Sequence, residues 1–189
     1  MTLANEITIG RILLIPVFVL FCVYYGQGVE AGNPQEWHRI AAIGVFVLAA
    51  VSDGLDGYFA RRLNQRSRFG AVLDPIADKI LLLAAILTLS FGSWKHAFPL
   101  WFPVLVILRD TVILTGCGVL YLLKHGLDVK PSWTGKAATV TQMIAVTWIM
   151  LQLPHYLVSV YLAGILTALS GIDYLARGSL ILRQQVQTN

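Results

Sequence analysis

Long apolar runs recur along the whole chain, and only short polar segments separate them. Hydrophobic residues make up 57% of the 189 residues and charged residues only 13%, about half the charged fraction of a typical soluble domain. An apolar run of about 20 residues is long enough to cross a bilayer as a helix. The pattern predicts an all-α, polytopic membrane protein with six transmembrane helices, in a single domain over residues 1–189. The predicted spans are 7–25, 37–60, 74–91, 99–123, 137–153 and 156–175.

The basic residues outside these spans or at their edges are unevenly distributed. Six spans place both termini and the segments around Gln65 and Lys130 on one side of the membrane. That side has nine basic residues, and the other has only Arg39 and Lys95. Since loops rich in Lys and Arg stay in the cytoplasm, both termini are predicted to be cytoplasmic. The net charge of +4 also suits membrane lipids or phosphorylated substrates, and we expect no nucleic-acid partner.

Four aspartates lie where the second and third predicted spans meet. Asp53 and Asp56 are three residues apart and Asp74 and Asp78 are four apart, so each pair shares one face of a helix. The segment NQRS, with Gln65 near its centre, predicts a tight turn between the pairs. An antiparallel helical hairpin around this turn would bring all four carboxylates to a similar depth, facing one another.

Carboxylates gathered in this way repel one another, so a positive group must hold them together in the ionised form. Lys or Arg could do so, but a divalent cation that prefers oxygen ligands, Mg²⁺ or Mn²⁺, fits four carboxylates better. Two such ions would form a clamp suited to phosphoryl chemistry. The alternative is a salt-bridge network that only caps two helix ends. The register of the aspartates, with the small residues Gly57, Ala60 and Gly70 beside them, favours the metal site.

Residues 53–78 also match an extended motif, D-x2-D-G-x2-A-R-x8-G-x3-D-x3-D, at every defined position. This motif resembles the signature of the CDP-alcohol phosphotransferases, a family with six spans and the motif across the second and third. The resemblance covers nearly the whole chain. The segment NEITIGR, residues 5–11, is similar to the N-x-x-T-x-x-R found in the family branch that makes phosphatidylglycerophosphate.

The resemblance implies that a hydroxyl attacks the lipid-bearing phosphate of CDP-diacylglycerol and that CMP leaves. It implies metal-ligand roles for Asp53, Asp56 and Asp74, and makes Asp78 the general base with a further contact to a metal. The residues implied to bind CDP-diacylglycerol are Gly57, Ala60, Arg61, Gly70, Asn5 and Thr8. Asn5 and Thr8 have an alternative role as caps of the first helix. We also expect a homodimer in a bacterial inner membrane, with the active site facing the cytoplasm.

Two further basic residues are candidates for binding the acceptor phosphate. Arg109 lies deep in the fourth predicted span, where a charge is costly, and the family commonly has an arginine followed by an acidic residue here. The alternative is neutralisation by Asp110 or by a partner in the third span. Lys136, at the mouth of the fifth span, is the second candidate, or else an ordinary positive-inside flank.

The expected function is transfer of the phosphatidyl group of CDP-diacylglycerol to glycerol 3-phosphate. The alternative acceptor is phosphatidylglycerol, which would make the protein a cardiolipin synthase. Cys117 stands where many phosphatidylglycerophosphate-forming relatives have a second arginine, and the pair Arg109-Asp110 resembles the cardiolipin-forming members. An ion or proton transporter is the alternative from another class, because intramembrane acids often mark ion pathways. Clustering of the acids in one hairpin, near one membrane edge, argues against it.

Overall fold

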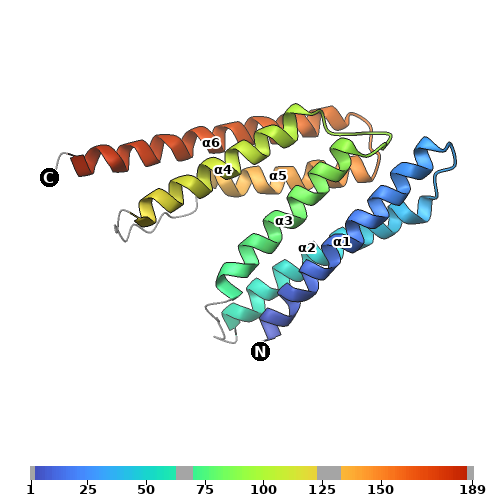
Figure 1. Cartoon of the computed structure of the whole chain (residues 1–189), viewed down its shortest axis with the longest axis horizontal. Helices are drawn as coiled ribbons and strands as arrows, with labels where there is room; N and C mark the ends of the chain where they lie inside the picture. The colour runs from blue at the N-terminus through green and yellow to red at the C-terminus, as the bar shows by residue number, and fades with distance from the viewer. Residues whose placement is uncertain (1–2, 63–69, 123–132, 187–189) are drawn as a thin grey trace. The chain divides into compact units, whose positions relative to one another are not determined.

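The computed structural model describes the backbone of residues 3–62, 70–122 and 133–186, and the side chains of residues 9–52, 79–116 and 133–178. These residues form six α-helices and no strand (Figure 1). The all-α prediction with six helical segments is therefore confirmed for the described chain. The helices are α1 Leu3–Glu30, α2 Glu36–Arg62, α3 Gly70–Phe91, α4 Trp101–Leu122, α5 Trp133–Met150 and α6 Tyr156–Val186.

Two of the described helices are long and apolar enough to cross a membrane, over Ile9–Glu30 in α1 and Tyr156–Gly178 in α6. A shorter apolar stretch, Lys79–Phe91, lies in α3. This finding concerns only the described residues, and the aspartate-rich ends of α2 and α3 lie largely outside the described side chains. Six transmembrane spans therefore stay a prediction.

Several helices extend beyond the predicted spans, because a helix does not have to end where the apolar run ends. α1 continues through Gly26 and Gly28, beyond the predicted end of the span at residue 25, and ends before Gly32. Gly32 has a φ of 69°, the left-handed conformation that commonly terminates a helix. α6 reaches Val186 instead of ending near residue 175, and Arg177 Nε donates a 2.9 Å hydrogen bond to Asp173 Oδ1 one turn earlier. Ion pairs at this i, i+4 spacing stabilise a helix.

The chain packs as two compact units. The N-terminal unit contains residues 1–98 and 149–153, and the C-terminal unit contains residues 99–148 and 154–189. The single domain expected from the sequence stays a prediction.

In the N-terminal unit, α1 packs against both α2 and α3 (Figure 1). The rings of Phe18 on α1 and Phe46 on α2 lie 5.7 Å apart, and both side chains are buried. Beyond the end of α3, Trp94 donates a 3.2 Å hydrogen bond from Nε1 to the carbonyl of Cys22 and packs its ring against Tyr25. These contacts hold α2 and the segment after α3 against α1.

In the C-terminal unit, α4 packs against α6 and hydrogen bonds join α5 to α6. Gly164 on α6 lies directly against the indole of Trp101 on α4. A Cβ atom at Gly164 would lie 2.7 Å from Trp101 Cη2, so only glycine permits this close approach of the two helices.

The turn between α5 and α6 contains the segment QLPH, residues 152–155, and lies where the predicted fifth span ends and the sixth begins. Gln152 and His155 have φ values of 54° and 56°, a left-handed conformation that costs a non-glycine residue roughly 1–2 kcal/mol. Two hydrogen bonds stabilise the turn. Gln152 Nε2 donates to Tyr25 Oη at 2.6 Å, and Trp148 Nε1 donates to the carbonyl of Pro154 at 3.0 Å.

Candidate active site

The four aspartates of the sequence motif fall on two helices of the N-terminal unit. Asp53 and Asp56 lie in α2, Asp74 and Asp78 lie in α3, and both helices pack against α1. The end of α2, the start of α3 and the start of α1 lie at the same end of this unit (Figure 1). This placement of the helix ends is compatible with the predicted hairpin.

The aspartates lie at similar distances along their helices from the end of α2 and from the start of α3. At about 1.5 Å per residue, Asp56 lies roughly 9 Å before the end of α2 and Asp74 roughly 6 Å after the start of α3. Asp53 and Asp78 lie roughly 14 Å and 12 Å from the same two helix ends. The two pairs therefore lie at similar distances along the helices from the two helix ends that the predicted turn joins. Gln65, the expected centre of the turn, lies outside the described residues.

The side chains of the four aspartates are also outside the described set, so the convergence of their carboxylates stays a prediction. Among the described side chains, no group of three or more His, Cys, Asp or Glu is placed to hold a metal ion. This finding leaves the four-aspartate site untested, and Asp53, Asp56, Asp74 and Asp78 remain the candidate metal ligands on the chemistry of their carboxylates.

The residues expected to bind the nucleotide lie near the same helix ends. Gly57, Ala60 and Arg61 occupy the last two turns of α2, and Gly70 is the first residue of α3. Asn5 and Thr8 lie inside α1, which already begins at Leu3, so neither is at the N-cap position proposed as their alternative role.

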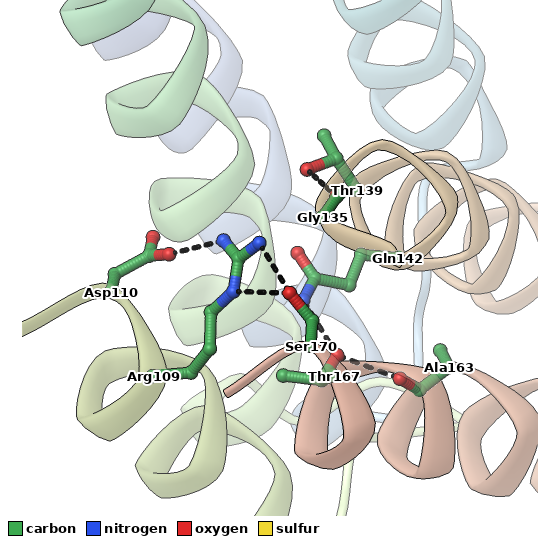
Figure 2. Close-up of polar contacts among 8 residues, drawn as sticks. All are labelled: Arg109, Asp110, Gly135, Thr139, Gln142, Ala163, Thr167 and Ser170. Carbon is green, nitrogen blue, oxygen red and sulfur yellow. Dashed lines mark hydrogen bonds and ion pairs between the residues drawn. The ribbon is translucent and has the colours of Figure 1, made fainter. Parts of the chain in front are cut away.

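Arg109, the predicted acceptor ligand on α4, is buried, with only 8% of its surface exposed. Its Nη1 lies 2.6 Å from Asp110 Oδ1. Its Nη2 and Nε donate to Ser170 Oγ on α6 at 2.9 Å and 3.3 Å (Figure 2). The pairing with Asp110 was the predicted alternative to phosphate binding, and it is present. A guanidinium group has five N–H donors, however, so this pairing alone does not exclude a phosphate.

Lys136, the second predicted acceptor ligand, is an exposed residue in the first turn of α5. Two residues earlier, the Thr134 hydroxyl donates a 2.8 Å hydrogen bond to Asp173 Oδ2 on α6. Asp173 also pairs with Arg177. The first turn of α5 is therefore fixed to α6 beside Lys136.

Three polar residues on α6 that bond to neighbouring helices were not identified from the sequence. Thr167, Ser170 and Asp173 are spaced three residues apart within an apolar helix, and each bonds to a neighbouring helix. Thr167 accepts from Gln142 on α5, Ser170 from Arg109 on α4 and Asp173 from Thr134 on α5. The i, i+3, i+6 spacing of these polar residues in a predicted span was the signal that could have revealed them.

The comparisons with known proteins agree with the motif. The family model described as CDP-alcohol phosphatidyltransferase matches residues 1–172. The CDP-diacylglycerol–glycerol-3-phosphate 3-phosphatidyltransferase of Escherichia coli strain K12 is 36% identical over 178 residues, which are 90% of this chain and 91% of that protein. The proteins of the same name from Shigella flexneri serotype 5b and Shigella sonnei match with the same identity and coverage. The chain belongs to the CDP-alcohol phosphatidyltransferase family.

Proposed function

We propose that the protein transfers the phosphatidyl group of CDP-diacylglycerol to glycerol 3-phosphate, giving phosphatidylglycerophosphate and CMP. The observation that carries this proposal is the 36% identity to relatives named for that reaction, over nine-tenths of the chain. The eight motif residues between Asp53 and Asp78 support the same reaction class. The family contains transferases, which leaves the ion-transporter alternative without support.

Four carboxylates with only oxygen donors fit Mg²⁺ or Mn²⁺, and we propose that Asp53, Asp56, Asp74 and Asp78 hold two such ions. Bound there, the ions would neutralise the diphosphate of CDP-diacylglycerol and stabilise the departing CMP. The similar distances of the two aspartate pairs from the end of α2 and from the start of α3 support this ligand set.

The remaining roles fall to side chains of the chain itself. The acceptor hydroxyl oxygen forms a bond to the lipid-bearing phosphorus, and the bond from that phosphorus to CMP breaks. The hydroxyl proton passes to the Asp78 carboxylate, which acts as general base. Arg61 holds the nucleotide phosphates, and Gly57 and Ala60 leave space for the nucleotide beside the backbone. Arg109 and Lys136 bind the phosphate of the acceptor.

Phosphatidylglycerol remains the second candidate acceptor because Cys117 removes one expected cation. A phosphodiester carries one charge and requires fewer basic partners than the phosphate monoester of glycerol 3-phosphate. The names of the relatives favour glycerol 3-phosphate.

The test is CMP release by the purified protein in detergent, with CDP-diacylglycerol, Mg²⁺ and each acceptor offered separately. We expect CMP and phosphatidylglycerophosphate with glycerol 3-phosphate. Arg109→Ala is expected to lose this activity, and Arg109→Lys to retain part of it because the charge beside Asp110 is kept. Release of CMP only with phosphatidylglycerol, together with cardiolipin formation, would show that the acceptor assignment is wrong.

We also propose that all six helices span the bacterial inner membrane, with both termini and the aspartates on the cytoplasmic side. Two sufficiently apolar helices and the nine-to-two distribution of basic residues support this placement. A homodimer remains the expected assembly.

Single cysteines test this topology in a background that lacks Cys22 and Cys117. Cysteines at Gln65 and Lys95 should react with a membrane-impermeant thiol reagent from opposite sides of the membrane. Lys95 is the better choice in its segment because its side chain is exposed, whereas the nearby Ser93 hydroxyl bonds to Glu30. Labelling of both cysteines from the same side would contradict the six-span arrangement.

A further inference from the structure

We infer that Ser170 is a positioning residue of the acceptor site, which holds the Arg109 guanidinium so that its remaining N–H groups can bind the acceptor phosphate. The inference rests on the proposed role of Arg109. Ser170 is 1% exposed and accepts hydrogen bonds from both Nε and Nη2 of Arg109 (Figure 2). The serine therefore fixes one whole edge of the guanidinium plane.

The guanidinium of Arg109 has N–H donors that its described partners do not use. The guanidinium has five N–H groups, one on Nε and two on each terminal nitrogen. Ser170 takes one from Nε and one from Nη2, and Asp110 takes one from Nη1. Among the described side chains no other residue bonds to Arg109, so one N–H remains on each terminal nitrogen. Two donors on one planar group are what bidentate phosphate binding needs.

Asp110 alone would fix the orientation of the Arg109 guanidinium less firmly than Asp110 and Ser170 do together. Asp110 is the next residue on the same helix, and its contact with the guanidinium is to Nη1, so a rotation of the guanidinium about that contact would redirect the remaining donors. Ser170, on a different helix, supplies a second fixed point. A hydroxyl also adds no negative charge, whereas a carboxylate at this position would repel an anionic acceptor.

Thr167 provides a matched control one turn earlier on α6. It is 0% exposed, accepts a 2.8 Å hydrogen bond from Gln142 Nε2 and donates to the carbonyl of Ala163 at 2.7 Å. It thus makes a buried inter-helix bond like that of Ser170, with α5 in place of α4. Thr167→Val keeps the shape of the side chain and removes the hydroxyl.

The experiment measures KM and kcat for both substrates with the purified full-length protein in detergent, with Mg²⁺. Loss of a hydrogen bond to a charged group predicts that Ser170→Ala raises KM for glycerol 3-phosphate by about tenfold or more. The KM for CDP-diacylglycerol should not change, and kcat should fall much less than the acceptor KM rises. The separate variant Ser170→Thr keeps the hydroxyl and should have an acceptor KM close to that of the wild-type protein. Thr167→Val should lower the melting temperature without changing the acceptor KM.

Ser170→Cys is a second test if Ser170→Ala does not fold, because the thiol has a similar shape and is only a weak acceptor. It should raise the acceptor KM in the same way. An unchanged acceptor KM in the folded variant, or an equal rise in the KM of both substrates, would overturn the positioning role. The same KM rise in Thr167→Val would also overturn it. Absence of wild-type turnover with glycerol 3-phosphate would instead overturn the proposed function.

Discussion

Asp78→Asn is expected to reduce turnover by roughly 10²–10⁴-fold, the usual contribution of a general base. The amide has nearly the shape of the carboxylate but cannot take up the hydroxyl proton. Binding of CDP-diacylglycerol should be largely retained, because Asp53, Asp56 and Asp74 still provide carboxylates. The measurements are single-turnover CMP release and the dissociation constant for CDP-diacylglycerol in the presence of Mg²⁺.

Asp173→Asn is the control for Asp78→Asn. Asp173 is also a helical aspartate, and its described partners are Thr134 and Arg177. This variant should keep a near-normal kcat at saturating glycerol 3-phosphate and lose some thermal stability. If Asp78→Asn retained full turnover, the base would have to be another residue.

Removal of divalent cations is expected to abolish activity completely. Without a cation, four neighbouring carboxylates repel both one another and the diphosphate of the substrate. Dialysis against EDTA should therefore stop CMP release, and addition of Mg²⁺ or Mn²⁺ should restore it. Activity as a function of free metal concentration gives the apparent affinity of the site.

Asp56→Asn connects the cation requirement to the proposed ligands. Loss of one carboxylate should raise both the Mg²⁺ concentration needed for half activity and the KM for CDP-diacylglycerol. The acceptor KM at saturating Mg²⁺ should change little. Persistent activity in EDTA, or an Asp56→Asn variant with the wild-type metal dependence, would argue against a metal held by these aspartates.

The sequence was sufficient to locate six helices because each predicted span is an apolar run bounded by polar segments. Helix ends were less predictable. Gly26 and Gly28 resemble a break but lie inside α1, and the left-handed residue that ends the helix is Gly32. α6 continues past its apolar run, where the ion pair between Asp173 and Arg177 stabilises the next turn. Hydropathy contains no information about either effect.

The sequence predicted those parts of the candidate site whose residues lie close together along the chain. The spacing of Asp53 and Asp56, and of Asp74 and Asp78, is enough to put each pair on one helical face. Arg109 was identified because a charge in an apolar run is unusual. Its partner Ser170 was not, because the two residues are 61 positions apart and meet only through the packing of α4 against α6.

The hydrogen bond between Gln152 and Tyr25 has a consequence for how the chain is made. The two residues are 127 positions apart. At about 5–20 residues per second, a ribosome needs roughly 6–25 s to synthesise the segment that separates them. During that interval the Tyr25 hydroxyl lacks the Gln152 donor, although Glu36, the acceptor of its own 3.5 Å hydrogen bond, is only eleven residues away. A side chain of one of the first helices to leave the ribosome thus gains a partner from a late turn, so this contact forms only after most of the chain has been synthesised.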